Sequence, residues 1–259
     1  MTCVHPTAVV HPSAKLGSQV EIGPWTVVGA DVAIGARSIV GAHVVLEGPL
    51  TMGADNHIYP HAVLGTAPQD IKYHNEPTRL EMGDHNLVRE FVTVHRGTPQ
   101  GRGYTRIGSD VFLMAYSHVG HDNLIGSNVV IANSVQLAGH VHLEDYAVIG
   151  GCTAIHQFVH VGAHAFVGGG SVVRMDVAPF CKVAGSRARL FGLNSVGLRR
   201  RGFSSEQLKI LRRAYRLAFL SNLLAVEAAA RIEAELIPLC PQLKDFIVFL
   251  RESERGITR

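Results

Sequence analysis

The chain of 259 residues has 47% hydrophobic and 17% charged residues, 27 glycines and a net charge of +3, a composition typical of a soluble, ordered protein. No stretch approaches the roughly 20 apolar residues needed to span a bilayer, and the N-terminus lacks the basic start and apolar core of a secretory signal. The four cysteines show neither metal nor redox spacing, so we expect ordinary thiols in a reducing, cytoplasmic setting.

From Val4 onward an aliphatic residue recurs every six positions, with two interruptions, as far as Val173. The residue four places after it is usually small or β-branched. Neither an α-helix nor a plain strand has this period, and a β-sandwich accounts poorly for so long a regular run. The period predicts a parallel β-helix of hexapeptide repeats, in which three repeats form one triangular coil.

The repeat is interrupted at two places. Across residues 66–79 the period of six is kept, but the inward positions become Asp70 and Glu76, so we expect this stretch to leave the wall as a loop. A second loop is predicted at about 99–106, where seven extra residues include one proline and two glycines. Long loops on a rigid solenoid are where binding residues tend to lie.

Beyond Pro179 the period becomes helical. Ser204 and Gln207 form a capping-box signal, and apolar residues follow at helical spacing. We therefore place the prism at residues 1–189 and a small helical domain at residues 190–259. The helical domain holds 12 Lys and Arg against 7 Asp and Glu, whereas the prism holds 12 against 14. This basic tail suggests an acidic partner, although a solvated helical surface would explain the charge as well.

Fifteen histidines are present, and the repeat predicts where they project. Four of them fall on successive coils at neighbouring places, and so line one edge of the prism at steps of roughly 5 Å: His95, His121, His140 and His156. His43 and His61 take the same place in the repeat, so part of this ladder could be only a surface habit. The loop that carries Asp70 and Lys72 lies nearby in coil order, which favours a site.

A metal centre is the main competing chemistry. Hexapeptide prisms also include zinc carbonic anhydrases, whose ligands resemble a His-x4-His pair with a third histidine upstream. No two histidines of this sequence are five positions apart. Zinc can be assembled from residues distant in sequence, but the expected signature is missing, so no metal ligands are predicted.

Six segments resemble, in their order and spacing, the cytoplasmic UDP-N-acetylglucosamine O-acyltransferases of lipid A synthesis. They are QDIKYHNEPTRLEMGD, VTVHRGT, HVGHDN, LAGHV, IGGCTAIHQF and GLRRRGF. The likeness covers essentially the whole chain and is far more specific than the repeat alone. It implies a left-handed parallel β-helix, a hand that spacing does not give, followed by the helical domain. It also implies a homotrimer with its sites in the clefts between neighbouring prisms.

The resemblance implies transfer of a 3-hydroxyacyl chain from an acyl carrier protein thioester to the 3-hydroxyl of UDP-N-acetylglucosamine, the first step of lipid A synthesis. His121 is then the general base, a role that suits an imidazole with a pKa near neutrality. Asp122 orients and supports the imidazole, and the backbone N–H of Gly139 faces the thioester oxyanion. No acyl-enzyme is expected, and no cofactor is needed beyond the phosphopantetheine that the carrier protein brings.

The remaining matches suggest substrate-binding residues. The sugar positions correspond to Asp70, His118, His140 and His156, with His95 and Gln157 beside them. The phosphate positions correspond to Lys72 and Arg200, and the nucleotide stretch contains Asn194 and Arg201; Lys and Arg supply charge-assisted hydrogen bonds to a diphosphate. One departure is Val196, which stands where the family has an acidic residue and puts a ribose contact in doubt. Gly169 leaves room for a longer acyl chain.

The acidic carrier protein is the expected partner of the basic tail, on six arginines: Arg199, Arg200, Arg201, Arg212, Arg213 and Arg216. Neither nucleic acid nor stable membrane insertion is expected. Two alternatives stay open. The related UDP-sugar N-acyltransferase has an additional N-terminal domain before its repeats, whereas here the repeat starts at Val4. A non-catalytic trimeric hexapeptide scaffold would not require His121 and Asp122. The motifs also leave open the acyl length and whether the acceptor at sugar carbon 3 is oxygen or an amine.

Overall fold

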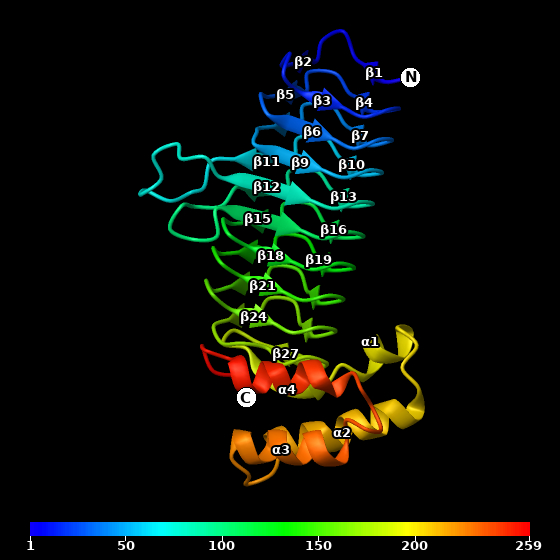
Figure 1. The fold of residues 1–259 in the computed structure, drawn as a ribbon, viewed down its shortest axis with the longest axis vertical. Coiled ribbons are helices and arrows are strands. Elements are labelled where there is room, and N and C mark those ends of the chain that lie inside the picture. Colours follow the sequence, from blue (N-terminus) through cyan, green and yellow to red (C-terminus); the bar gives the residue numbers. More distant parts are fainter.

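The computed structural model describes residues 1–259, with the exception of the side chain of residue 225. The strands stack into a long three-walled prism, with the N-terminus at one end and a group of helices at the other (Figure 1). Up to β26 (Val172–Val173), consecutive strands enter the three walls in turn, and neighbours within a wall are parallel. The predicted fold class, a mainly β hexapeptide-repeat prism followed by a small α-helical part, is confirmed.

We number the walls in the order in which the chain enters them. The first wall contains β1 (Cys3–Val4), β4 (Glu21–Ile22), β7 (Ile39–Val40), β10 (His57–Ile58), β13 (Leu87–Val88), β16 (Phe112–Leu113), β19 (Val130–Ile131), β22 (Val148–Ile149), β25 (Phe166–Val167), β27 (Cys181–Ala184) and β28 (Arg189–Leu193). The second wall contains β2 (Val9–Val10), β5 (Val27–Val28), β8 (Val45–Leu46), β11 (Val63–Thr66), β14 (Thr93–His95), β17 (His118–Val119), β20 (Gln136–Leu137), β23 (Ala154–Ile155) and β26. The third wall contains β3 (Lys15–Leu16), β6 (Val32–Ile34), β9 (Leu50–Met52), β12 (Arg79–Met82), β15 (Tyr104–Ile107), β18 (Leu124–Ile125), β21 (His142–Leu143) and β24 (His160–Val161). The last pair of the first wall, β27 and β28, is antiparallel.

The period of six produces walls because one aliphatic residue per repeat fills the interior. Ile58, Leu64 and Leu113 are fully buried along the axis of the prism. Burial of each such side chain contributes about 1.5–3 kcal/mol. The corners turn through left-handed backbone, for example at His43 with φ 56° and Asp122 with φ 58°. Asp, Asn and His tolerate this conformation better than most residues, so they collect at the corners.

Two loops leave the same edge of the prism, the edge between the second and third walls (Figure 1). The first loop covers residues 67–78, between β11 and β12, and the second covers residues 96–103, between β14 and β15. Because β14 ends at His95 and β15 already begins at Tyr104, the second loop starts and ends earlier in the chain than the predicted span of 99–106. Each loop is inserted at a turn between two walls, so the pairing of strands within the walls is not interrupted.

Strand registers record the length of both insertions. His118 pairs with Gln136, eighteen positions on, which is the ordinary coil. Val63 pairs with Thr93, thirty positions on, and Thr93 pairs with His118, twenty-five positions on. The excess of twelve residues in the first case equals two repeats, so the period of six survives while the coil does not. A position assigned by dividing the residue number by eighteen therefore falls on one edge of the prism before the first loop and on another edge after it.

Four helices follow the prism: α1 (Ser195–Arg200), α2 (Ser205–Phe219), α3 (Ala225–Glu235) and α4 (Leu243–Glu252). The capping box of α2 is present, since Ser204 Oγ accepts a hydrogen bond from Gln207 N, and Gln207 Oε1 accepts one from Ser204 N. The helices share a second hydrophobic core with Phe180 and Cys181 of the last coil. Among the residues that the structure describes, no helix is both long and apolar enough to cross a membrane.

Candidate active site

The four histidines of the predicted ladder lie along one edge, where strands of the second wall turn toward the third. His95 ends β14, and His121, His140 and His156 follow β17, β20 and β23. The ring centroids of His121 and His140 are 5.0 Å apart, and the ring of His95 is 5.2 Å from that of His118 on β17. This is close to the spacing of stacked strands. We call the turns that carry these four residues the histidine edge; both loops leave from it.

His43 and His61 lie on a different edge, so the prediction that they share the ladder is wrong. Their rings stack 4.9 Å apart, and the stack continues through Phe91 and Tyr116 at 5.0 and 4.9 Å. These four residues precede strands of the second wall, whereas the ladder residues end or follow such strands. The twelve residues of the first loop explain the error. They equal two repeats, so the period of six continues, but they are not a whole coil of eighteen, so residues after the loop lie on a different edge from the one that simple counting gives. The ladder is therefore a local feature and not a habit of every coil.

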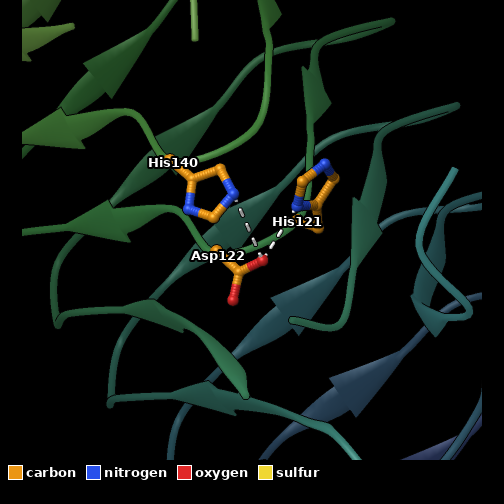
Figure 2. Close-up of side chains that lie close together, drawn as sticks. All are labelled: His121, Asp122 and His140. Carbon is orange, nitrogen blue, oxygen red and sulfur yellow. Dashed lines mark hydrogen bonds and ion pairs between the residues drawn. The ribbon is translucent and has the colours of Figure 1, made fainter. Parts of the chain in front are cut away.

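His121 and Asp122 form a hydrogen-bonded pair at the histidine edge (Figure 2). His121 Nδ1 lies 2.8 Å from Asp122 Oδ2. Asp122 is 0% exposed and His121 is 19% exposed, so the acid lies beneath the imidazole. Because an ionised carboxylate only accepts hydrogen bonds, Nδ1 carries the proton and Nε2 keeps its lone pair. The basic nitrogen of the pair is therefore Nε2, the ring nitrogen that Asp122 does not contact.

The second loop supplies further hydrogen bonds to Asp122. Thr98 Oγ1 donates to Oδ2 at 2.7 Å, Thr98 N donates to both oxygens at 3.1 and 3.0 Å, and Arg102 N donates to Oδ1 at 2.8 Å. Burial raises the pKa of Asp122, but the hydrogen bonds from His121, Thr98 and the two backbone N–H groups outweigh it and lower the pKa below the usual value. The carboxylate is thus held in its ionised form.

His140 approaches the same carboxylate from the next coil. Its Nε2 lies 3.8 Å from Asp122 Oδ2, and its ring meets that of His121 edge to face. Burial lowers the pKa of His140, and the charge of Asp122 only partly opposes this effect. On its other side the ring stacks on Phe158 at 4.5 Å. His140 is therefore a neutral, oriented hydrogen-bonding group near pH 7.

His121, Asp122 and His140 place their donor atoms within 4.8 Å of one another, which is compatible with a metal ion (Figure 2). The Asp122 oxygens, however, already accept hydrogen bonds from Thr98 N, Thr98 Oγ1, Arg102 N and His121 Nδ1. A carboxylate has about four lone-pair positions, so a metal would have to displace a bond. The donor set suits proton transfer better than metal binding.

Gly139 occupies the place of His121 one coil further on. A Cβ atom at Gly139 would lie 2.5 Å from His121 Cε1 and 2.6 Å from Nε2. Contacts this short are not tolerated without movement of the imidazole. Glycine therefore lets the backbone at this position lie directly beside the basic nitrogen, as the predicted oxyanion role requires.

His95 and His118 are supported by the wall and are neutral near pH 7. His95 Nδ1 lies 2.7 Å from Ala67 O, which fixes the proton on Nδ1 and ties the start of the first loop to the edge. His118 Nδ1 lies 2.8 Å from Thr93 Oγ1. Burial lowers the pKa of both rings, that of His118 to about 4.

The first loop brings Asp70 toward the histidine edge. Asp70 Oδ1 accepts a hydrogen bond from Lys72 N at 3.0 Å, and the Asp70 charge slightly opposes the lowering of the pKa of His140. Lys72 is exposed on the loop. Arg96 was not predicted and anchors the loop, because its Nη2 donates to Tyr73 Oη at 3.1 Å.

At the far end of the histidine edge, His156 and Gln157 are exposed. His156 Nδ1 lies 3.1 Å from Gln157 O, so the ring is loosely held by its own turn. Neither residue contacts the His121–Asp122 pair in one chain.

Four predicted residues lie away from the histidine edge. Three of them line a cavity of about 530 Å³ over the first wall. Six of its lining residues are Phe166, Lys182, Asn194, Val196, Arg200 and Arg201. In a triangular cross-section this wall is opposite the edge between the second and third walls. Gly169 lies at a third position, on the turn between β25 and β26. One prism alone therefore does not bring these groups together.

Local contacts fix two of the cavity residues. Asn194 caps α1: its Oδ1 accepts a hydrogen bond from Gly197 N at 3.1 Å, and its Nδ2 donates to His164 O at 3.0 Å. The Arg201 guanidinium lies 4.8 Å over the ring of Tyr146. Asn194 and Arg201 are thus held in defined orientations beside α1.

Comparison with known families gives two matches within the chain. Residues 176–258 match the family described as UDP N-acetylglucosamine O-acyltransferase, domain 2. Residues 13–48 and 104–139 match the bacterial transferase hexapeptide family. The chain is also 53% identical to the acyl-[acyl-carrier-protein]–UDP-N-acetylglucosamine O-acyltransferase of Anaeromyxobacter sp. (strain Fw109-5), over 99% of each chain. It is 47% identical, over the full length of both, to the enzyme of the same name from Herminiimonas arsenicoxydans.

Solved structures agree with the sequence relatives. The crystal structure of UDP-N-acetylglucosamine O-acyltransferase from Moraxella catarrhalis superposes with a TM-score of 0.96 at 41% identity, covering 99% of each chain. That of the Francisella novicida UDP-N-acetylglucosamine acyltransferase gives 0.95 at 36% identity, covering 99% of this chain and 94% of the other. The similarity includes the helical end as well as the prism. The chain belongs to the UDP-N-acetylglucosamine O-acyltransferase family.

Proposed function

We propose that the protein transfers a 3-hydroxyacyl chain from the thioester of acyl carrier protein to the 3-hydroxyl of UDP-N-acetylglucosamine, the first step of lipid A synthesis. The observation that carries this proposal is the His121–Asp122 pair, in which a buried, ionised carboxylate holds the Nδ1–H tautomer at 2.8 Å. Family membership supports the substrates, since the named relatives are acyl-carrier-protein-dependent O-acyltransferases of this sugar nucleotide.

His121 Nε2 takes the proton of the sugar 3-hydroxyl as that oxygen attacks the thioester carbonyl carbon. Such general-base assistance contributes about 10²–10⁴ in rate. Asp122 stabilises the imidazolium that forms, and the Gly139 N–H donates to the carbonyl oxygen as it becomes negative, an interaction typically worth about 2.7–4 kcal/mol. The tetrahedral intermediate then expels the phosphopantetheine thiolate, which takes the proton back from His121. The products are the acylated sugar nucleotide and the free carrier thiol.

We propose a homotrimer in which the histidine edge of one prism faces the first wall of its neighbour. The separation of the predicted residues within one chain supports this arrangement, because Asn194, Arg200 and Arg201 lie on the wall opposite the edge that carries His121. Contact between neighbouring prisms would place a cationic cavity beside the base, as a sugar diphosphate requires. Gly169, on the turn between β25 and β26, then leaves room for the acyl chain.

Roles for the other residues follow from this arrangement. The sugar is proposed to lie against Asp70, His118, His140 and His156, with His95 and Gln157 supporting it. Lys72 and Arg200 meet the phosphates, while Asn194 and Arg201 border the nucleotide. Val196 is 58% exposed in the cavity and offers no hydrogen bond, so the ribose lacks an acidic acceptor at this position.

The carrier protein is proposed to dock on the basic helical part, which we delimit at residues 190–259 beside a prism of residues 1–189. Six arginines are available for an acidic partner: Arg199, Arg200, Arg201, Arg212, Arg213 and Arg216. Arg213 is already paired with Glu235, and Arg200 and Arg201 are proposed to meet the nucleotide, which leaves Arg199, Arg212 and Arg216 as the stronger candidates. Both proposed substrates are cytoplasmic, so we propose that the protein is cytoplasmic as well. We propose neither a nucleic-acid partner nor stable insertion into a membrane.

A purified-enzyme assay tests the proposed function. The protein is incubated with UDP-N-acetylglucosamine and carrier-bound 3-hydroxyacyl donors of several lengths, and products are identified by mass spectrometry. We expect O-acylated UDP-sugar, and loss of turnover in His121→Ala with the trimer intact by analytical ultracentrifugation. Acylation only of an acceptor with a 3-amino group would favour N-acyl transfer. A stable trimer without turnover on either acceptor would favour a scaffold.

A further inference from the structure

The second loop folds over Asp122 and donates hydrogen bonds to both of its carboxylate oxygens. We define the Asp122 cradle as Thr98, Gly101 and Arg102. We infer that this cradle positions the Asp122 carboxylate for His121 and away from His140, with Thr98 as the positioning side chain. The inference rests on the proposed function, because it matters for turnover only if His121 is the base.

The cradle holds both oxygens of Asp122. Oδ1 accepts from Arg102 N at 2.8 Å, and Oδ2 accepts from Thr98 Oγ1 at 2.7 Å, while Thr98 N lies 3.1 and 3.0 Å from the two oxygens. The Thr98 hydroxyl is itself oriented, because it accepts a hydrogen bond from Gly101 N at 3.2 Å. With its lone pair engaged by Gly101, the hydroxyl points its proton at Asp122. The rotamer of the carboxylate is thus fixed from three directions.

Such fixing is needed because two imidazoles compete for the same oxygen. Asp122 Oδ2 lies 2.8 Å from His121 Nδ1 and 3.8 Å from His140 Nε2. A small rotation of the carboxylate would bring Oδ2 toward His140 and weaken the bond that sets the tautomer of His121. Asp122 is 0% exposed, so bulk water does not solvate the carboxylate in place of the cradle. Thr98 therefore helps to keep the Asp122 carboxylate hydrogen-bonded to His121 and not to His140.

Gly101 is the sterically critical residue of the cradle. A Cβ atom at Gly101 would lie 2.5 Å from Asp122 Cγ and Oδ1 and 2.6 Å from Oδ2. By contrast, a Cβ atom at Gly103, in the same loop, meets nothing within 4 Å. Its φ of 74° is one that Asn tolerates. The two glycines provide a matched pair, one inside the cradle and one outside it.

The first test compares Thr98→Val, which removes only the hydroxyl donor, with Thr98→Ser, which keeps it. A hydrogen bond to a charged group is strong enough that its loss is expected to lower kcat about tenfold, with the KM for the UDP-sugar unchanged. Carbon-13 NMR of labelled aspartate, with Asp122→Asn to assign the signal, should show the Asp122 carboxyl titrating about one pH unit higher in Thr98→Val. Thr98→Ser should restore both values.

Wild-type kcat and titration in Thr98→Val would overturn the inference, and so would equal losses in Val and Ser, which indicate a packing role. Gly101→Ala provides a second variant. We expect it to lose more activity than Thr98→Val, while Gly103→Asn stays close to wild type; equal effects would count against the cradle. The NMR titration separates this inference from the proposed function. If the titration moves while His121→Ala retains turnover, the cradle stands and the proposed base is wrong.

Discussion

Two ring ladders of this prism have nearly the same spacing but different surroundings. His43, His61, Phe91 and Tyr116 stack at 4.9–5.0 Å on one edge, and His121 and His140 lie 5.0 Å apart on another. Only the second ladder has a buried carboxylate beneath it and two loops beside it. The spacing is a product of the coil, whereas the second ladder differs by the Asp122 carboxylate beneath it and by the loop that donates hydrogen bonds to this carboxylate.

The comparison predicts opposite outcomes for two histidine substitutions. His121→Ala should lower kcat by about 10²–10⁴, because the sugar hydroxyl loses its base. His61→Ala, on the other ladder, should leave kcat within a few-fold of wild type, since it removes only one stacked ring. Steady-state kinetics on both variants checks this; equal losses would mean that the ladders are not functionally distinct.

Asp122→Asn should show how much the Asp122 carboxylate contributes to kcat when the His121 imidazole is kept. Loss of a hydrogen bond to a charged group costs about 1.5–3 kcal/mol, so kcat should fall about 10- to 100-fold. Stability should change as well. The folded-state pKa of Asp122 is lowered by its hydrogen bonds, so its ionised form stabilises the fold above the unfolded value of about 3.9, and this contribution is lost as pH falls through the folded pKa.

Thermal melts at several pH values check the stability effect. The variant should have a lower Tm than wild type near pH 7, and the difference should shrink in acid. A difference that grows as the pH falls would contradict the assigned direction of the pKa shift.

The acyl path can be probed at Gly169, away from both ladders. Gly169→Met should shift the preferred donor to a shorter chain, because each methylene excluded from an apolar path costs about 0.8 kcal/mol, roughly fourfold in kcat/KM. Competition between donors of different lengths, read by mass spectrometry, measures the shift. An unchanged preference would remove Gly169 from the acyl path.

The smallest effect is expected at Val196. Val196→Glu restores an acceptor in the cavity over the first wall and should lower the Kd for the UDP-sugar by about two- to tenfold, the value of one ordinary hydrogen bond. Isothermal titration with UDP-N-acetylglucosamine checks this, with Val196→Gln as a neutral control. Weaker binding in both variants would mean that the ribose does not reach this position.

Sequence alone predicted the prism and the histidine edge because a solenoid ties each place in the repeat to one direction in space. It failed at His43 and His61, because the first loop has the length of two repeats and conceals the shift of edge. It also missed the cradle. Two of the donors to Asp122 are backbone N–H groups, which every residue but proline possesses, so no residue type signals them.

Other omissions have different physical causes. α1 spans six residues and includes a glycine, so propensity does not reveal it; its cap, Asn194, and the basic residues of its last turn are weak local signals. The separation of Asn194 and Gly169 from His121 is invisible in a list of motifs, because motif order records the chain and not the opposite walls of the prism. These gaps concern contacts between segments, whereas the correct predictions concern periodicity within them.

The most direct test is a crystal structure with UDP-N-acetylglucosamine bound to the trimer. We predict that the sugar lies between two prisms, with its 3-hydroxyl within about 2.6–3.2 Å of His121 Nε2 and its diphosphate at the arginine-lined cavity of the first wall. A sugar bound elsewhere, or one whose 3-hydroxyl faces away from His121, would contradict the proposed mechanism.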